Sequence, residues 1–106
     1  MAMWTEFKAE VHFFSTAKGG RTGAVLSGYR PLFDFGVTQE DGQRVYNDAQ
    51  LFLEDGDQAQ PGDIREVRVK PFHPELLAGV LRPGLQFAIT EGARVVGKGR
   101  VLKRLR

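Results

Sequence analysis

The sequence predicts a small all-β domain, either a barrel or a sandwich, and three observations lead to this fold class. Short segments in which apolar and polar residues alternate recur along the chain, and a period of two is typical of a strand with one face in a core. Turn segments rich in glycine separate these strands. No long segment has the period of about 3.6 residues that marks an amphipathic helix. At 106 residues, the chain fits one compact domain, which we expect to span residues 1–106.

The first predicted strand is the clearest. Residues 7–13 place apolar side chains at the odd positions and polar ones at the even positions. Residues 18–23 then hold three glycines and no apolar side chain, which predicts a turn or an exposed loop. After a short apolar stretch at residues 24–26, Phe33 and Phe35 share one face of the next strand.

The middle of the chain predicts another strand and an acidic loop. A hairpin-type turn at residues 39–42 leads into a strand at residues 45–53, although the apolar side chains of that strand do not alternate regularly. Residues 54–63 are acidic and hold no apolar side chain larger than alanine, apart from one proline. We therefore expect a loop over these ten residues.

The strand after the acidic loop is expected to begin irregularly. Val67 and Val69 share one face, whereas Ile64 is out of phase with them, which predicts an irregularity or a β-bulge at the start of the strand. Residues 74–83 have helical spacing for about two turns, a pattern that fits either a short helical turn or a loop. A further alternating strand follows at residues 85–89.

The last predicted strand is unusually basic. It follows a turn at Glu91 and Gly92, and four cations fall on its even positions: Arg94, Lys98, Arg100 and Arg104. Because a strand rises about 3.3 Å per residue, positions two apart are about 6–7 Å apart, comparable with successive phosphates of a nucleic acid. Such a face could follow a nucleic-acid backbone. Val96 and Leu102 interrupt the pattern, however, and edge strands also carry cations to block aggregation.

The net charge of +2 conceals an uneven distribution. Residues 1–64 carry five cations and ten anions, whereas residues 65–106 carry ten cations and three anions. An anionic partner such as RNA would therefore meet the second half of the chain. The alternative is that the fold interleaves the two halves and evens out the charge.

Several classes of function are disfavoured by what the sequence lacks. Without cysteine there is neither a disulfide framework nor a thiolate zinc site. No phosphate-binding P-loop motif occurs, and His12 and His73 have no carboxylates at helpful spacing. We expect no cofactor, no metal and no enzymatic activity, since no nucleophile is seen beside a base. With no apolar run of about 20 residues and no signal-peptide pattern, we expect a cytoplasmic protein without membrane contact.

Six blocks of the sequence, in order and spacing, resemble the C-terminal domain, domain 3, of translation elongation factor Tu. They lie at residues 7–11, 19–21, 27–31, 61–63, 85–92 and 94–99. The resemblance implies a six-stranded antiparallel Greek-key β-barrel. The chain holds no GTPase domain, and its first and last residues favour a complete, stand-alone protein.

The resemblance also implies partners. In that family the domain packs against the second barrel and the GTPase domain, contacts the T stem of aminoacyl-tRNA and meets the exchange factor. Carried over to this sequence, Arg21, Glu91 and Gly92 match positions near the tRNA backbone. One hypothesis is a non-catalytic domain that binds tRNA, another structured RNA or a translation factor. The residues we expect to contact nucleic acid are Arg21, Arg30, Glu91, Gly92, Arg94, Lys98 and Arg100.

The alternative hypothesis is a protein-interaction module that competes for the partners of the elongation factor and has no part in tRNA delivery. Its contacts would come from an apolar neighbourhood made of Tyr29, Leu32 and Phe33.

Overall fold

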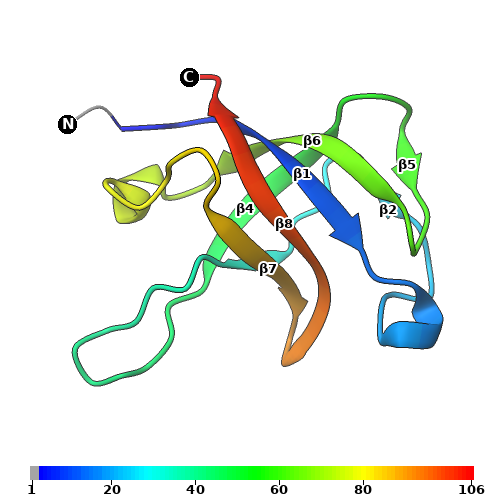
Figure 1. Ribbon diagram of the computed structural model, residues 1–106, viewed down its shortest axis with the longest axis horizontal. Helices are drawn as coiled ribbons and strands as arrows, with labels where there is room; N and C mark the ends of the chain where they lie inside the picture. Colours follow the sequence, from blue (N-terminus) through cyan, green and yellow to red (C-terminus); the bar gives the residue numbers. More distant parts are fainter. Residues whose placement is uncertain (1–2) are drawn as a thin grey trace.

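The computed structural model describes residues 3–106 (Figure 1). Over this range the chain forms eight strands: β1 (Phe7–Phe13), β2 (Val25–Leu26), β3 (Leu32–Asp34), β4 (Asn47–Leu53), β5 (Gln58–Ala59), β6 (Ile64–Pro71), β7 (Gln86–Glu91) and β8 (Arg94–Arg104). Two short 3-10 helices, η1 (Thr16–Lys18) and η2 (Pro74–Leu77), connect them. Within residues 3–106, neither helix is long and apolar enough to cross a membrane.

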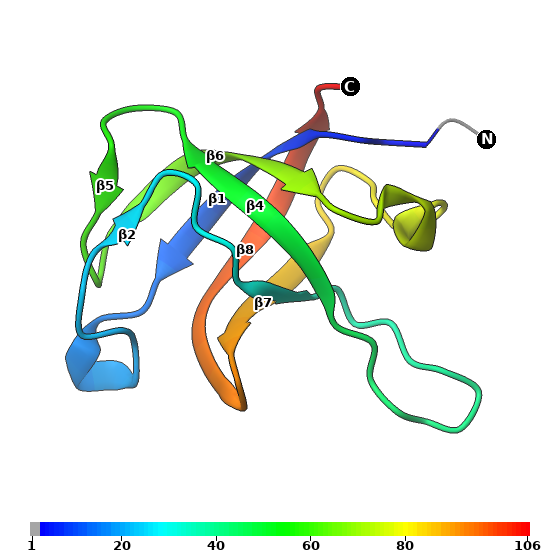
Figure 2. The same cartoon turned by 180° about the vertical axis from the view of Figure 1, so that it is seen from behind.

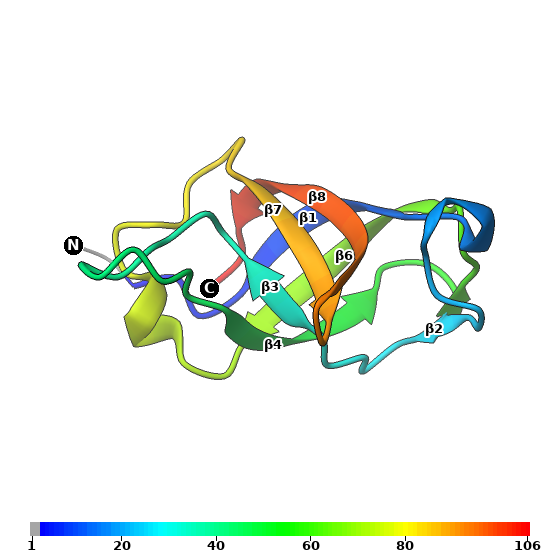
Figure 3. The same ribbon diagram turned by 90° about the horizontal axis from the view of Figure 1, so that it is seen from below.

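Six of the strands close into an antiparallel barrel in the order β1-β6-β4-β3-β7-β8. The first strand pairs with β6 on one side and with β8 on the other, and β3 pairs with β7. These pairings between strands distant in sequence give the six-stranded antiparallel Greek-key barrel that the resemblance implied. The small β2–β5 sheet and η1 lie at one end of the molecule, and η2 lies at the other end (Figures 2 and 3).

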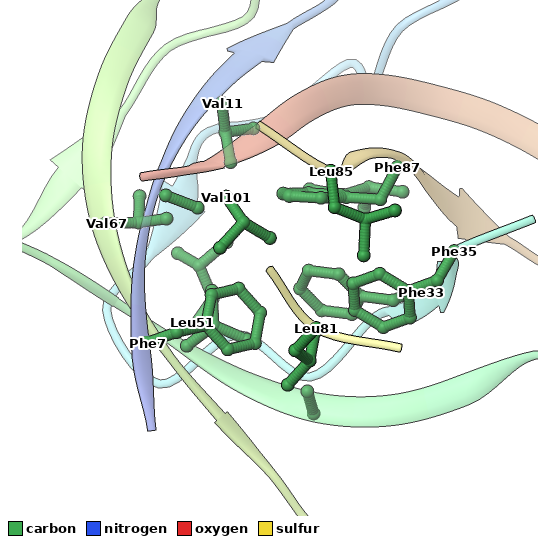
Figure 4. Close-up of a cluster of buried hydrophobic side chains, with 14 of the residues drawn as sticks. Phe7, Val11, Phe33, Phe35, Leu51, Val67, Leu81, Leu85, Phe87 and Val101 are labelled. Atoms are coloured by element: carbon green, nitrogen blue, oxygen red, sulfur yellow. The ribbon is translucent and has the colours of Figure 1, made fainter. Parts of the chain in front are cut away.

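The core fills the barrel with the apolar positions of the alternating strands. Phe7 and Val11 are fully buried, as the alternation at the first strand predicted. Phe33, Phe35 and Phe87 form an aromatic cluster in the interior (Figure 4), with ring centroids 5.3–5.7 Å apart. Aromatic pairs at such distances add to the stabilisation that burial alone provides.

Several local predictions are confirmed. The hairpin turn forms, with the Gly42 N–H donating to the Gln39 carbonyl at 2.9 Å. The resulting loop between β3 and β4 projects away from the barrel (Figure 1). A helical turn, η2, occurs within the segment for which helix and loop were both considered.

Two local predictions are wrong. Residues 58–59 form β5 inside the predicted acidic loop, because Ala59 is small enough to pack fully buried beside Val25. The expected bulge at Ile64 is absent from the β1–β6 pairing, which runs without a shift to the His12–Ile64 pair. Ile64 is out of phase because its side chain points outward and is 62% exposed.

The register irregularities lie in β8 instead. Gly97 pairs with Ile89 and Val95 pairs with Thr90, so Val96 is an extra residue opposite β7. Likewise, Leu102 is skipped between the pairs that β8 makes with β1. Both are β-bulges, which turn the side chains on either side out of simple alternation. The four cations on even positions of this strand therefore do not share one face.

Close packing of β8 against β1 and the core depends on glycine at position 99. A Cβ there would lie 2.5 Å from the backbone oxygen of Glu10 and 2.6 Å from the ring of Phe87. We expect Gly99→Ala to lower the free energy of unfolding by about 1–3 kcal/mol, the usual cost of overpacking a core. Urea denaturation measures this change.

Gly23→Ala is the matched control, because Gly23 is exposed and a Cβ there would have no neighbour within 4 Å. We expect it to leave stability unchanged or to raise it by less than about 1 kcal/mol. Equal destabilisation by the two substitutions would contradict the assignment of a steric role to Gly99.

Candidate nucleic-acid interface

The outer face of β6, β1 and β8 carries a group of cations that the strand register brings together. Lys8 of β1 is paired with Arg68 on β6 and with Lys103 on β8, so one row across three strands holds three cations. Further along β8, Lys98 and Arg100 are also exposed on this face. We call these five residues the basic wall: Lys8, Arg68, Lys98, Arg100 and Lys103.

Carboxylates neutralise part of the basic wall through contacts between neighbouring strands. Like charges face each other directly at the Glu10–Glu66 pair, an arrangement that destabilises a sheet. Two ion pairs relieve it: Lys8 Nζ lies 3.3 Å from Glu66, its diagonal neighbour, and Arg100 Nε lies 3.5 Å from Glu10, its direct partner on β1. Such exposed pairs are weak, worth about 0.2–1 kcal/mol each.

Arg68 is held more firmly than the other cations of the wall. Its guanidinium donates to Glu6 at 2.9 Å and lies 4.7 Å from the ring centroid of Phe52. Glu6 is a nearly buried carboxylate, and Arg106 at the chain end approaches it to 3.6 Å. Arg68 therefore has a structural role as well as a charge on the surface.

Lys98 and Lys103 are the exceptions on the wall. Among the residues that the structure describes, no carboxylate lies within ion-pair distance of either ammonium group. Both side chains are exposed. They give the wall positive charge that the protein itself does not neutralise.

Arg21, Tyr29 and Glu91 meet in a separate cluster that joins three segments distant in sequence. The Tyr29 hydroxyl donates to the Glu91 carboxylate, and Arg21 Nε lies 3.2 Å from the same oxygen. The Arg21 guanidinium also lies 4.8 Å from the Tyr29 ring centroid. Burial, followed by the hydrogen bond and the negative charge of Glu91, raises the pKa of Tyr29 well above its usual value. The cluster ties the glycine-rich loop to the β7–β8 turn, where Gly92 adopts a φ of 60°.

The other predicted contacts lie elsewhere. Arg30 stacks on Phe72 at 4.3 Å from the ring centroid, beside β3 and β4, which are across the barrel from β8 and β1. Arg94 is exposed, but the bulge at Val96 separates it from Lys98. The predicted nucleic-acid residues therefore occupy three places and not one continuous surface.

The predicted protein-binding neighbourhood requires a correction. Phe33 is 0% exposed and belongs to the aromatic core, so its side chain is not available to a partner. The inward position follows from the alternation in β3, which leaves Leu32 outside and 38% exposed. Tyr29 is half-buried in the cluster with Arg21 and Glu91.

Three members of the basic wall were not predicted: Lys8, Arg68 and Lys103. Lys8 was visible on the outward parity of the first strand, and Arg68 lies between the core positions Val67 and Val69. These three cations come together only because of which strands pair and in which register. Alternation within a single strand does not predict that pairing.

Neither His12 nor His73 forms a metal site with carboxylates in the part of the chain that the structure describes. Between residues 3 and 106, no group of three or more potential ligands from His, Cys, Asp or Glu lies close enough to hold an ion. The His12 ring packs edge-on against Phe14 at 5.6 Å, and His73 lies 3.5 Å from Glu75.

Together these features define a six-stranded antiparallel β-barrel domain with a positively charged outer wall. A family model described as the elongation factor Tu C-terminal domain matches residues 1–104. The chain belongs to this family. The C-terminal domain of elongation factor Tu is a non-catalytic β-barrel, and the GTPase activity of the factor lies in another domain.

The raised pKa of Tyr29 makes a testable prediction. Because the folded-state pKa exceeds the unfolded value, the neutral phenol stabilises the fold fully below about pH 10. This contribution should disappear as the pH rises above that value. In Tyr46→Phe, where Tyr29 is the sole tyrosine, we expect phenolate absorbance to appear at higher pH in the folded protein than in urea.

The double variant Tyr46→Phe/Tyr29→Phe provides the absorbance baseline. It should also lack the fall in stability that ionisation of Tyr29 causes in the single variant. Ionisation at the same pH in the folded and unfolded states would refute the half-buried hydrogen bond from Tyr29 to Glu91.

Proposed function

We propose that this domain binds a translation-related RNA, such as tRNA, through the basic wall, and that it acts without catalysis in the cytoplasm. The observation that carries the proposal is the row of Arg68, Lys8 and Lys103 across three neighbouring strands. Neighbouring strands are about 4.8 Å apart and alternate residues about 6.6 Å apart. The wall therefore offers cations at intervals that suit a phosphate backbone.

Membership in the elongation factor Tu family supports an RNA ligand, because this family generally interacts with tRNA and translation factors. Lys98 and Lys103 would contribute most, since each brings a charge that no carboxylate of the described chain offsets. Arg94 and Arg100 are further exposed cations of the same strand, β8. Arg30 and Gly92 would be reached only by an RNA that wraps beyond the wall.

Arg21 and Glu91 take a different role in this proposal. The two side chains form an ion pair with each other, and the Tyr29 hydroxyl also donates to Glu91. Their charges are therefore balanced within the protein. These two side chains orient the β7–β8 turn, and β8 begins directly after this turn at Arg94.

Binding of tRNA over a salt series tests the proposal. Each phosphate contact adds about one unit to the slope of log affinity against log salt. We expect Lys98→Ala/Lys103→Ala to reduce this slope by about two between about 50 and about 200 mM KCl. Fluorescence anisotropy with labelled tRNA measures both affinity and slope.

Lys18→Ala is the control, because Lys18 is an exposed cation on η1 and lies outside the wall. It should leave the slope within about half a unit of the wild-type value. No binding at low salt would remove the RNA function, and an equal loss in the control would remove the basic wall as the binding site.

A second candidate function is docking of a translation factor protein. Leu32, Tyr46 and Phe72, which we call the apolar face, are 38%, 49% and 39% exposed. Leu32 is paired with Asp48, whose carbonyl accepts from the Phe72 N–H, and Tyr46 directly precedes β4, so the three lie around one end of β4, the strand next to β6. This face keeps the protein-interaction hypothesis open, with Leu32 retained and with Tyr46 and Phe72 in place of Tyr29 and Phe33.

Leu32→Ser tests this second function. We expect it to weaken binding to the GTPase domain of elongation factor Tu by about fivefold or more, as for a central apolar contact. Ile64→Ser, which changes an apolar residue that is 62% exposed elsewhere on the barrel, is the control. Calorimetry measures both. A wild-type domain that binds no such partner would exclude this function.

A further inference from the structure

A shallow depression of about 200 Å³ lies beside the basic wall, between β7, β8 and β1. One of its sides is a row of outward side chains from the three strands. The register places Arg100 of β8 between Gln86 of β7 and Glu10 of β1. All three side chains line the depression.

The second side of the depression is formed by Lys98 of β8 and His12 of β1, which are also direct neighbours in the register. Phe87 and Gly99 are paired between the two rows and line the floor. Because adjacent rows on one face are about 6–7 Å apart, the two rows leave room between them for one small polar group.

The groups around this space are mostly hydrogen-bond donors. The Lys98 ammonium has no ion-pair partner among residues 3–106. Arg100 uses one nitrogen, Nε, in its contact with Glu10 at 3.5 Å, which leaves the other guanidinium donors. The Gln86 amide and the His12 imidazole can each donate as well.

We infer that this depression is a phosphate subsite, in which Lys98, Arg100 and His12 bind a single phosphate group. The inference deepens the proposed RNA function and rests on it for the source of the phosphate, which would be one phosphodiester of the bound strand. A free phosphate ion offers the same chemistry and is the second source to be distinguished. In both cases the contacts are charge-assisted hydrogen bonds.

Glu10 is the one acidic residue that lines the subsite within the described part of the chain. Its carboxylate repels an anion, but it also forms an ion pair with Arg100, Nε to carboxylate 3.5 Å, and so holds that guanidinium at the edge of the depression. The depression of about 200 Å³ is far larger than the space that a single water needs. A phosphate group therefore fits together with several waters that can separate it from Glu10.

The two histidines provide the experiment, because His12 lines the depression and His73 lies beyond the end of β6 next to Glu75. Inorganic phosphate is added to the full chain at constant pH and ionic strength, with chloride as the balancing anion. Imidazole resonances are followed by NMR. We expect the His12 signals to move and saturate with phosphate, while the His73 signals stay in place.

Variants assign the effect to the subsite. We expect Lys98→Ala to weaken phosphate binding by about tenfold, the loss of one charge-assisted hydrogen bond. Glu10→Gln should strengthen it by about twofold to fivefold, because a like charge is removed. Lys103→Ala removes a cation of the same wall outside the depression and should change binding by at most about twofold.

A short RNA added in place of phosphate separates the two sources. Movement of His12 with both ligands supports the subsite on the proposed RNA surface. Movement with phosphate alone keeps the subsite and overturns the RNA function. If RNA binds but neither ligand moves His12, or if Lys98→Ala and Lys103→Ala weaken phosphate equally, the subsite is wrong and the RNA function is unaffected.

Discussion

Pairing of β1 with both β6 and β8 is the constraint on which the rest of the structure depends. A strand hydrogen-bonded on both sides cannot slip by one residue without turning all its core side chains outward. Phe7 and Val11 are therefore fixed inside the barrel, and Lys8 and Glu10 are fixed outside. Because both neighbouring strands are basic on their outer faces, the pairing that closes the barrel also assembles the basic wall.

The glycines of β8 connect the core to the candidate site. Cβ atoms at Gly97 and Gly99 would lie 2.9 Å and 2.5 Å from backbone oxygens of β1, so the two strands can pack this closely only without side chains at these positions. Phe87 fills the interior beside Gly99, while the outer side of the same pair is the floor of the depression. The packing requirement inside and the hollow outside thus have one cause. A larger residue at position 99 would disturb both.

Local patterns in the sequence predicted what depends on one strand at a time. The alternation at residues 7–13 predicted a correct strand with its inward and outward positions. Several such strands predicted the all-β class, barrel or sandwich, and the resemblance to the family selected the barrel. Contacts between distant segments were beyond such patterns, because period-two alternation contains no register. The bulge at Val96, the pairing of Arg21 with Glu91 and the complete burial of Phe33 all arise from neighbours on other strands or loops.

The uneven charge of the sequence survives folding only in part. The acidic first half supplies Glu10 to Arg100 and Glu6 to Arg68, so interleaving neutralises several cations of the basic second half. It does not reach Lys98, because the neighbours of Lys98 across β1 and β7 are His12 and Ala88, neither of which is a carboxylate. An exposed ammonium group with a histidine on one side and an alanine on the other is stabilised more by an incoming anion than by any residue of its own sheet. That local imbalance, and not the net charge of +2, is the electrostatic reason to place a phosphate at this point of the barrel.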